Sequence, residues 1–193
     1  MIDRYTGKEM GHIFSLENKY AIWQEIEVLA CEAQAELGAI GITREEAAWI
    51  RAHASFNCAE VDEIEAVSNH DVIAFLTNMG SYIDADISDG EPKPSRWVHY
   101  GMTSTDLGDT ALCYQLTQAC DILIRRVQSC AKICKRRAFE ERDTLCVGRT
   151  HGIHAEPMTF GMKFGSWAWE LKRDLDRLRD ARKNVAYGAI SGA

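Results

Sequence analysis

A long stretch without proline, and with only Gly108 as a glycine, dominates the second half of the chain. It runs from about Ser104 to Glu140, and its apolar residues recur every three or four positions. This spacing places apolar side chains on one face of an α-helix, and a run of this length is typical of a helical bundle. A second such stretch runs from Pro157 to about Tyr187. Two helices of this kind bury only part of their apolar faces against each other, so we expect a larger helical assembly.

Shorter helices are predicted in the first half of the chain. From about Ser15 to Leu37 the apolar residues trace one helical stripe, which ends at Gly38 as a C-terminal cap. Thr43 and Glu46 have the spacing of a capping box, which marks the start of the next helix. The stripe consists of Ala21, Ile22, Ile26, Leu29, Ala30, Ala33 and Leu37.

The chain is predicted to be all-α, because no sustained alternation of apolar and polar residues and no Asn-Gly or Asp-Gly hairpin occurs between apolar runs. Two further short helices are expected at about 59–67 and 71–81. The segment 87–96 holds two of the three prolines and is typical of a loop or linker. We expect a small N-terminal helical domain over residues 1–102, followed over residues 103–193 by the first long helices of a central bundle.

Composition excludes several classes of protein. The chain is 46% hydrophobic and has a net charge of −7 without a basic stripe, which argues against disorder and against nucleic-acid binding. Its seven cysteines form no CxxC pair and its N-terminus has no signal pattern, so we expect a protein of the reducing cytoplasm. No apolar run approaches the roughly 20 residues that span a bilayer, so we expect no membrane partner.

Residues Arg149–Pro157 place two imidazoles, a guanidinium and a carboxylate before an apolar helix that is expected to begin at Pro157. Histidine titrates near neutrality, so His151 or His154 can donate or accept a proton beside an anion. A polar turn with Pro157 at the first helical position explains the same residues. A metal site is the weaker alternative, because His151, His154 and Glu156 have no further histidine or cysteine nearby.

Two other segments are candidates for a site. The hydroxyls of Thr103–Asp106 come where the long helix begins, beside unpaired backbone N–H groups that suit a carboxylate or a phosphate. Ordinary N-capping explains one of these residues. His70 and Asp71 begin a short helix, where the imidazole either faces a cleft or lies on the surface. His99, between Val98 and Tyr100, is either a further site residue or a buried core histidine.

These segments together resemble the adenylosuccinate lyase family of the fumarase/aspartase superfamily. The resemblance is to the N-terminal portion of such a protein, covers essentially the whole chain, and rests on Arg4–Tyr5, His70–Val72, Trp97–Asp106 and Gly148–Pro157. It implies β-elimination of fumarate from adenylosuccinate, giving AMP, and from the succinyl-carboxamide ribotide of purine synthesis, giving its aminoimidazole carboxamide product. It implies no cofactor and no metal. The implied partners are an anionic nucleotide substrate and further copies of the chain in a homotetramer.

The resemblance also assigns roles to individual residues. It implies that His151 is the general acid that protonates the leaving nitrogen, assisted by His70. Thr103 and Ser104 are expected to hold the succinyl carboxylate. The expected contacts with the nucleotide are Arg4, Tyr5 and His99 at its phosphate, and Asn69 and Asp71 along its pocket.

The chain departs from the family pattern in two places. Some relatives carry arginine at the position of Asn69, so a charged phosphate contact is not implied there. The family's base is a serine in a mobile loop with the signature Ser-Ser-x-Met-Pro-x-Lys-x-Asn-Pro, and no such run occurs before Ala193. We therefore expect a truncated piece that is inactive alone and whose parent is active. The alternatives are another fumarate-releasing lyase of the superfamily and a helical scaffold without catalysis.

Overall fold

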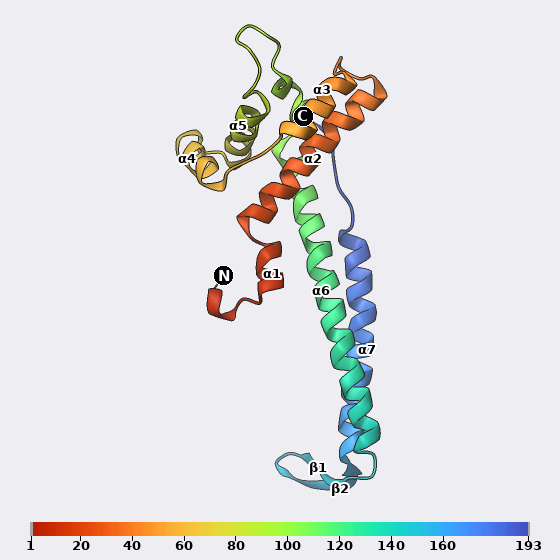
Figure 1. Cartoon of the computed structure of the whole chain (residues 1–193). Coiled ribbons are helices and arrows are strands. Elements are labelled where there is room, and N and C mark those ends of the chain that lie inside the picture. The colour runs from red at the N-terminus through yellow and green to blue at the C-terminus, as the bar shows by residue number, and fades with distance from the viewer. Residues whose placement is uncertain (1, 193) are drawn as a thin grey trace. The chain divides into compact units, whose positions relative to one another are not determined.

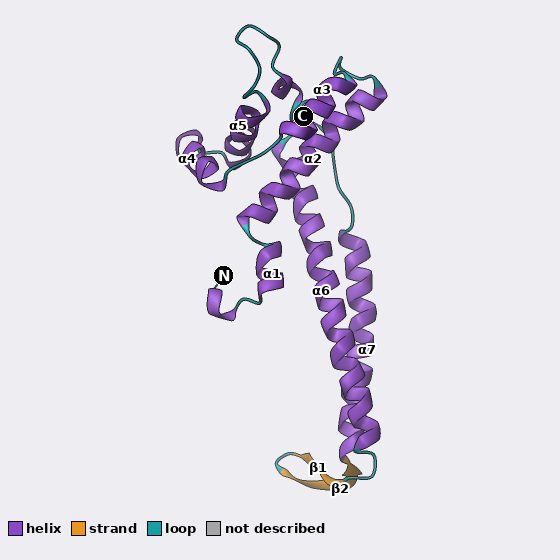
Figure 2. Ribbon diagram, viewed as in Figure 1, coloured by secondary structure: helices purple, strands orange, loops and turns teal. Residues whose placement is uncertain are grey.

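A computed structural model describes residues 2–192, except the side chain of Asp3, and is predominantly helical (Figure 1). Figure 2 shows one small sheet among the helices. The elements are the 3-10 helix η1 (Asp3–Tyr5), α1 (Lys8–Ile13), α2 (Leu16–Leu37), α3 (Arg44–His53), α4 (Cys58–Ser68), α5 (Asp71–Ile83), the 3-10 helix η2 (Pro94–Trp97), α6 (Ser104–Glu140), β1 (Leu145–Thr150), β2 (Ile153–Thr159) and α7 (Phe160–Val185). The predicted all-α class is confirmed, and a two-stranded antiparallel sheet is added to it.

The chain divides into two compact units. Unit 1 comprises Met1–Gln115 and Tyr187–Ala193, and unit 2 comprises Leu116–Ala186. Helix α6 begins in unit 1 and continues into unit 2. Along the chain, unit 2 is therefore inserted between two segments of unit 1.

The ends of the shorter helices follow the signals in the sequence. The Ser15 side chain accepts a hydrogen bond from the backbone N–H of Asn18 at the start of α2, and Gly38 ends this helix in a left-handed conformation. Thr43 and Glu46 form the predicted capping box at the start of α3. The predicted caps of α2 and α3 are confirmed.

The buried face of α2 differs from the predicted stripe. Ala21, Leu29, Ala33 and Leu37 are exposed, although all four belong to that stripe. Aromatic residues and a glutamate occupy much of the buried face. A stripe drawn through aliphatic residues alone therefore points in a different direction about the helix axis from the face that is buried. The buried residues of α2 are Tyr20, Ile22, Trp23, Glu27, Val28, Cys31 and Ala35.

An aromatic cluster forms the centre of unit 1. Phe75 of α5 is fully buried, and its ring centroid lies 5.3 Å from that of Tyr20 and 5.5 Å from that of Trp23, both on α2. The ring of Phe56 lies 6.0 Å away. Contacts at these separations add to the stabilisation that burial provides. The cluster joins α2 to α5 and to the segment before α4.

Residues 145–159 form a β-hairpin instead of a turn that leads directly into a helix. Pro157 lies in β2 opposite Val147, and α7 begins at Phe160. The residue before a proline favours extended backbone, and an edge strand tolerates a residue without an N–H group. The expected helix start at Pro157 is therefore wrong.

In unit 2 the backbone of α7 begins in contact with the end of α6. The N–H of Gly161 donates to the carbonyl oxygen of Glu141 at 2.9 Å. A β-carbon at Gly161 would lie 2.5 Å from the carbonyl oxygen of Ala138 and 2.8 Å from the Cα of Arg142. Because these are backbone atoms, they cannot rotate away as a side chain can.

We therefore expect Gly161→Ala to destabilise unit 2 by about 1–3 kcal/mol, the usual cost of forcing extra volume into a packed contact. Gly165→Ala in the same helix is the matched control, since a β-carbon there meets nothing within 4 Å. Alanine should stabilise that position by about 1 kcal/mol through its helix propensity. Thermal unfolding followed by circular dichroism compares the two variants, and equal midpoints would contradict the close approach.

Candidate functional site

The hairpin of unit 2 carries the predicted proton-transfer residues at its tip. His151 and Gly152 form the turn between β1 and β2, and both have left-handed backbone (φ 51° and 74°), as a two-residue type I′ turn requires. His154 pairs with Arg149 across the two strands. Every residue from Arg149 to Pro157 is exposed. The hairpin thus brings the two imidazoles and the guanidinium together on one solvent-facing element.

The N-terminal candidates lie in η1 of unit 1. Arg4 and Tyr5 are both exposed, and the guanidinium carbon of Arg4 lies 4.9 Å from the centroid of the Tyr5 ring. This distance allows a cation–π contact, which contributes little at an exposed position. Both side chains are accessible to a ligand.

Three predicted residues meet where α4 ends and α5 begins. Asn69 ends α4 with left-handed backbone (φ 53°), and His70 is the N-cap of α5. The His70 Nδ1 atom accepts a hydrogen bond from the backbone N–H of Ile73 at 3.4 Å. Asp71 binds Lys19 of α2 through Oδ2 at 3.2 Å. Because Nδ1 of His70 is used as an acceptor, Nε2 is the ring atom left to act on a ligand.

Helix α2 also holds the segment Trp97–Tyr100. Cys31 and Gln34 of α2 lie on the same face as Glu27, four and seven residues after it. The Cys31 thiol lies 3.5 Å from the carbonyl oxygen of Trp97, and Gln34 donates to the carbonyl oxygen of Tyr100 at 3.1 Å. The segment is therefore fastened to α2 on both sides of His99.

The fully buried carboxylate of Glu27 contacts His99 twice. Its Oε2 accepts from the backbone N–H of His99 at 2.8 Å, and its Oε1 lies 2.6 Å from Nδ1 of the ring. The backbone of His99 is left-handed (φ 62°), which is uncommon outside glycine. Burial raises the pKa of the Glu27 carboxyl, and the hydrogen bonds from His99 oppose this effect. Glu27 was not among the predicted site residues, because it is one of five glutamates in α2 and no local signal separates it from the others.

The start of α6 carries the predicted carboxylate-binding hydroxyls. Thr103 precedes the helix and Ser104 is its first residue. Asp106 accepts hydrogen bonds from the backbone N–H groups of Ser191 (2.9 Å), Thr103 (3.0 Å) and Gly192 (3.1 Å). These hydrogen bonds, with that from Ser191 first, lower the pKa of the Asp106 carboxyl. Asp106 thereby fastens the segment after α7 to the first turn of α6.

Acid should release this segment. A carboxyl whose pKa is lowered in the folded state stabilises that state at pH values above its ordinary pKa, here 3.8, and the stabilisation is lost as the pH falls through the lower, folded value. Hydrogen exchange at the amides of Ser191 and Gly192 should therefore accelerate as the pH is lowered below about 4, relative to unstructured reference peptides. Asp106→Asn should remove this pH dependence, and a wild type without it would contradict the assignment.

Helix α2 positions two of the predicted segments in unit 1. It reaches Asp71 through Lys19 and His99 through Glu27, which are about two helical turns, or about 12 Å, apart along the helix axis. His70 adjoins Asp71, so two of the predicted imidazoles depend on the same helix. His151 belongs to unit 2, where it lies with the other hairpin residues.

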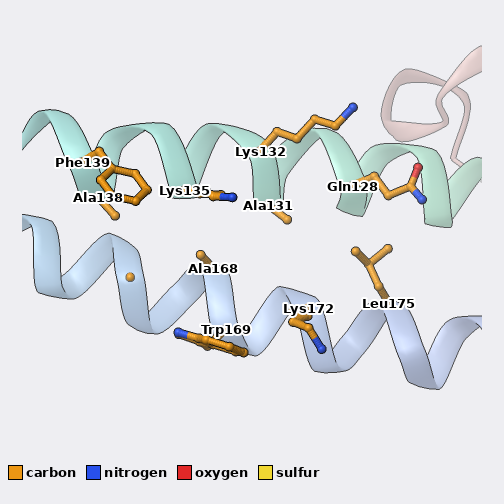
Figure 3. Close-up of a pocket in the computed structure, with 11 residues that line it drawn as sticks. Gln128, Ala131, Lys132, Lys135, Ala138, Phe139, Ala168, Trp169, Lys172 and Leu175 are labelled. Carbon is orange, nitrogen blue, oxygen red and sulfur yellow. The ribbon is translucent and has the colours of Figure 1, made fainter.

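A groove of about 680 Å³ runs between α6 and α7 within unit 2. Figure 3 shows Ala131 of α6 and Ala168 and Leu175 of α7 directed into the space between the helices. None of the predicted site residues is among the residues that line it. Its charged lining residues are Lys132, Lys135 and Lys172.

Asn69 lines a shallow hollow of about 400 Å³ on unit 1, together with Asp62, Glu65 and Ala66. The two carboxylates disfavour a phosphate group there. A nucleotide phosphate therefore needs other residues to hold it.

Three further properties concern the described part of the chain. Over residues 2–192, the side chain of Asp3 apart, no three His, Cys, Asp or Glu side chains are grouped so that they could hold a metal ion. Within the same range, no helix combines the length and apolar character that crossing a membrane requires. All seven cysteines have free thiols.

Comparison with known proteins covers the whole chain. A family model described as Lyase matches residues 4–193. All 193 residues align with adenylosuccinate lyase from Bacillus subtilis (strain 168) at 45% identity and with that from Staphylococcus saprophyticus at 42%, and the chain spans 42% of the length of each relative. Among solved structures, it is similar to fumarate lyase from Mesorhizobium sp. BNC1 (TM-score 0.85, 27% identity, 95% of this chain and 42% of that one). It is also similar to 3-carboxy-cis,cis-muconate lactonizing enzyme from Pseudomonas putida (TM-score 0.89, 28% identity, 100% of this chain and 44% of that one).

Proposed function

Since this chain belongs to the Lyase family, we propose that the whole protein cleaves the C–N bond of adenylosuccinate by β-elimination and releases AMP and fumarate. We extend the proposal to the equivalent cleavage of the succinyl-carboxamide ribotide in purine nucleotide biosynthesis. The observation that carries it is 45% identity, over the whole chain, to an adenylosuccinate lyase. The chain spans 42% of the length of that relative, so the proposal concerns the whole protein.

The reaction divides into three chemical tasks. A base removes a proton beside a carboxylate, the resulting carbanion is stabilised, and the leaving nitrogen receives a proton. We assign the last task to His151, whose exposed imidazole lies at the hairpin tip. We assign His70 to assist it, because the N-cap hydrogen bond uses Nδ1 and leaves Nε2 for a ligand or a second imidazole. We assign the base to no residue of this chain.

The start of α6 supports binding of the succinyl carboxylate. The Thr103 and Ser104 hydroxyls lie at the positive end of a long helix, which favours an anion. Asp106 lies in the same turn, and the three backbone N–H groups that donate hydrogen bonds to its carboxylate offset its negative charge. For the nucleotide we assign Arg4, Tyr5 and His99 to the phosphate, and Asn69 and Asp71 to the pocket.

An assay of the full-length protein tests the function. We expect fumarate, followed by its absorbance, to be released from adenylosuccinate and not from argininosuccinate or aspartate. The similarity to a fumarate lyase at 27% identity supports a second candidate, a fumarate-releasing lyase with a different substrate. Release from argininosuccinate or aspartate instead of adenylosuccinate would favour that candidate.

We also propose that the whole protein associates into a homotetramer through α6 and α7. Both helices expose large apolar residues at levels unusual for a surface that stays in water. These residues include Ile133 (51% exposed), Phe139 (62%), Trp167 (47%) and Trp169 (64%). Sedimentation of the full-length protein should report the mass of four chains, and a monomer would overturn this proposal.

A further inference from the structure

The buried carboxylate of Glu27 takes no part in the elimination described above, yet it contacts a site histidine. A carboxylate is stable in the protein interior only when it is paired and hydrogen-bonded. Glu27 is fully buried, and its two oxygens lie 2.6 Å and 2.8 Å from the ring Nδ1 and the backbone nitrogen of His99. This pairing joins residues that are 72 positions apart in the sequence.

The pairing determines which ring atom of His99 can meet a ligand. Oε2 of Glu27 accepts the backbone N–H of His99, which favours the ionised carboxylate against the effect of burial. An ionised carboxylate only accepts hydrogen bonds, so Nδ1 then carries a proton and donates it to Oε1. A neutral ring with its proton on Nδ1 would leave the buried negative charge uncompensated, whereas an imidazolium compensates it. The second proton of an imidazolium is on Nε2. The His99 side chain is 18% exposed.

The backbone contacts hold the ring in place. The N–H of His99 donates to the same carboxylate while its φ is 62°, so Glu27 restrains both the backbone and the ring. Cys31 and Gln34 of α2 hold the flanking Trp97 and Tyr100. Rotation of the ring away from Glu27 would leave a buried charge without a partner, which is costly.

We propose that Glu27 is a positioning residue, which holds His99 as an oriented imidazolium whose Nε2–H donates to the phosphate of the nucleotide. This inference rests on the proposed function for the identity of the ligand, and on the Glu27–His99 geometry for the state of the ring. A charged donor strengthens a hydrogen bond to a phosphate oxygen. Glu27 itself does not touch the substrate.

The state of the ring is tested by ¹⁵N NMR of the full-length protein labelled at histidine, at pH 7. We expect both ring nitrogens of His99 to be protonated, with the signal assigned by its absence in His99→Asn. Glu27→Gln keeps the size of the side chain and an acceptor for the backbone N–H, but it removes the charge. In this variant His99 should become neutral, with one ring nitrogen unprotonated. A neutral His99 in the wild type, or an unchanged ring in Glu27→Gln, overturns the proposal.

Binding and kinetics test the role of that state. For Glu27→Gln we expect the Kd for AMP, measured by calorimetry, and the KM for adenylosuccinate to rise about tenfold, as for loss of one charge-assisted hydrogen bond, while kcat changes little. His99→Asn should give the same rise, and asparagine tolerates the left-handed backbone at that position. Glu25→Gln, on an exposed position of α2, is the matched control and should change neither quantity. A fall in kcat without a rise in Kd or KM overturns the proposal.

The two proposals fail in different ways. If the full-length protein releases no fumarate and binds no AMP, the proposed function fails, whereas the NMR measurement still decides whether Glu27 holds His99 as an imidazolium. If fumarate is released and the ring of His99 is neutral, only the role of Glu27 fails.

Discussion

His151→Asn in the full-length protein should lower kcat for adenylosuccinate by at least about a hundredfold, because general-acid catalysis contributes about 10²–10⁴-fold to such reactions. Asparagine cannot deliver the proton that the leaving nitrogen needs. It does tolerate the left-handed backbone at this position (φ 51°), so the hairpin turn should persist. His151 is exposed, and its replacement leaves no cavity in a core. Steady-state fumarate release measures the loss.

The matched control is another exposed histidine with no assigned role. His12 lies on α1 in unit 1 and is exposed, so His12→Asn should leave kcat unchanged. Thermal unfolding of both variants should match the wild type. If His151→Asn keeps more than about a tenth of the wild-type rate, the imidazole is not the general acid.

Phe75→Ala should lower the free energy of unfolding of unit 1 by about 3–5 kcal/mol, the usual cost of removing a buried aromatic side chain. The ring is fully buried and lies within 6.0 Å of three other aromatic rings. Two of the surrounding rings are fixed on helix α2 and the third lies in the segment before α4, so they cannot all move inward to fill the space. Chemical denaturation followed by tryptophan fluorescence is a suitable measurement, since Trp23 adjoins Phe75.

A substitution of an exposed residue provides the comparison for Phe75. Val67 of α4 is 84% exposed in the same unit, and Val67→Ala should change stability by less than about 0.5 kcal/mol. If Phe75→Ala costs less than about 1 kcal/mol, the aromatic cluster is not the centre of the core.

Local signals in the sequence were sufficient to predict most of the helices. Ser15 and Gly38 delimit α2, Thr43 and Glu46 cap α3, and the proline-free run predicts α6 over Ser104–Glu140, as found. Each of these signals acts within one or two turns of the helix. Which face of α2 is buried depends instead on contacts with distant segments, and that face was predicted incorrectly.

The hairpin was missed because its strands lack the usual alternation. Three of the six residues of β1 and five of the seven residues of β2 are exposed, in runs rather than in alternation, so no period of two arises from burial. The usable signal was His151-Gly152, since histidine is among the residues enriched in left-handed backbone and glycine adopts it readily. An Asn-Gly or Asp-Gly criterion excludes this pair.

The candidate site could be predicted as a set of residues but not as an arrangement. The imidazoles, hydroxyls and carboxylates can be recognised from residue type and from their positions near predicted helix starts and turns. The pairing of Glu27 with His99 depends on tertiary packing, because the partners are 72 positions apart. Helix α2 contains five glutamates, and the sequence does not show which of them is buried and therefore needs a partner.

The fastening of Ser191 and Gly192 to Asp106 has a consequence for synthesis of the protein. Asp106 meets Gly192 across 86 positions, and Thr110 bonds to Ala189 across 79. At about 5–20 residues per second, a ribosome needs roughly 4–17 s to extend the nascent chain from the first partner to the last. During this interval the start of α6 lacks the segment after α7 to which Asp106 and Thr110 are later hydrogen-bonded. Unit 1 is thus completed only after the whole of unit 2 has been translated.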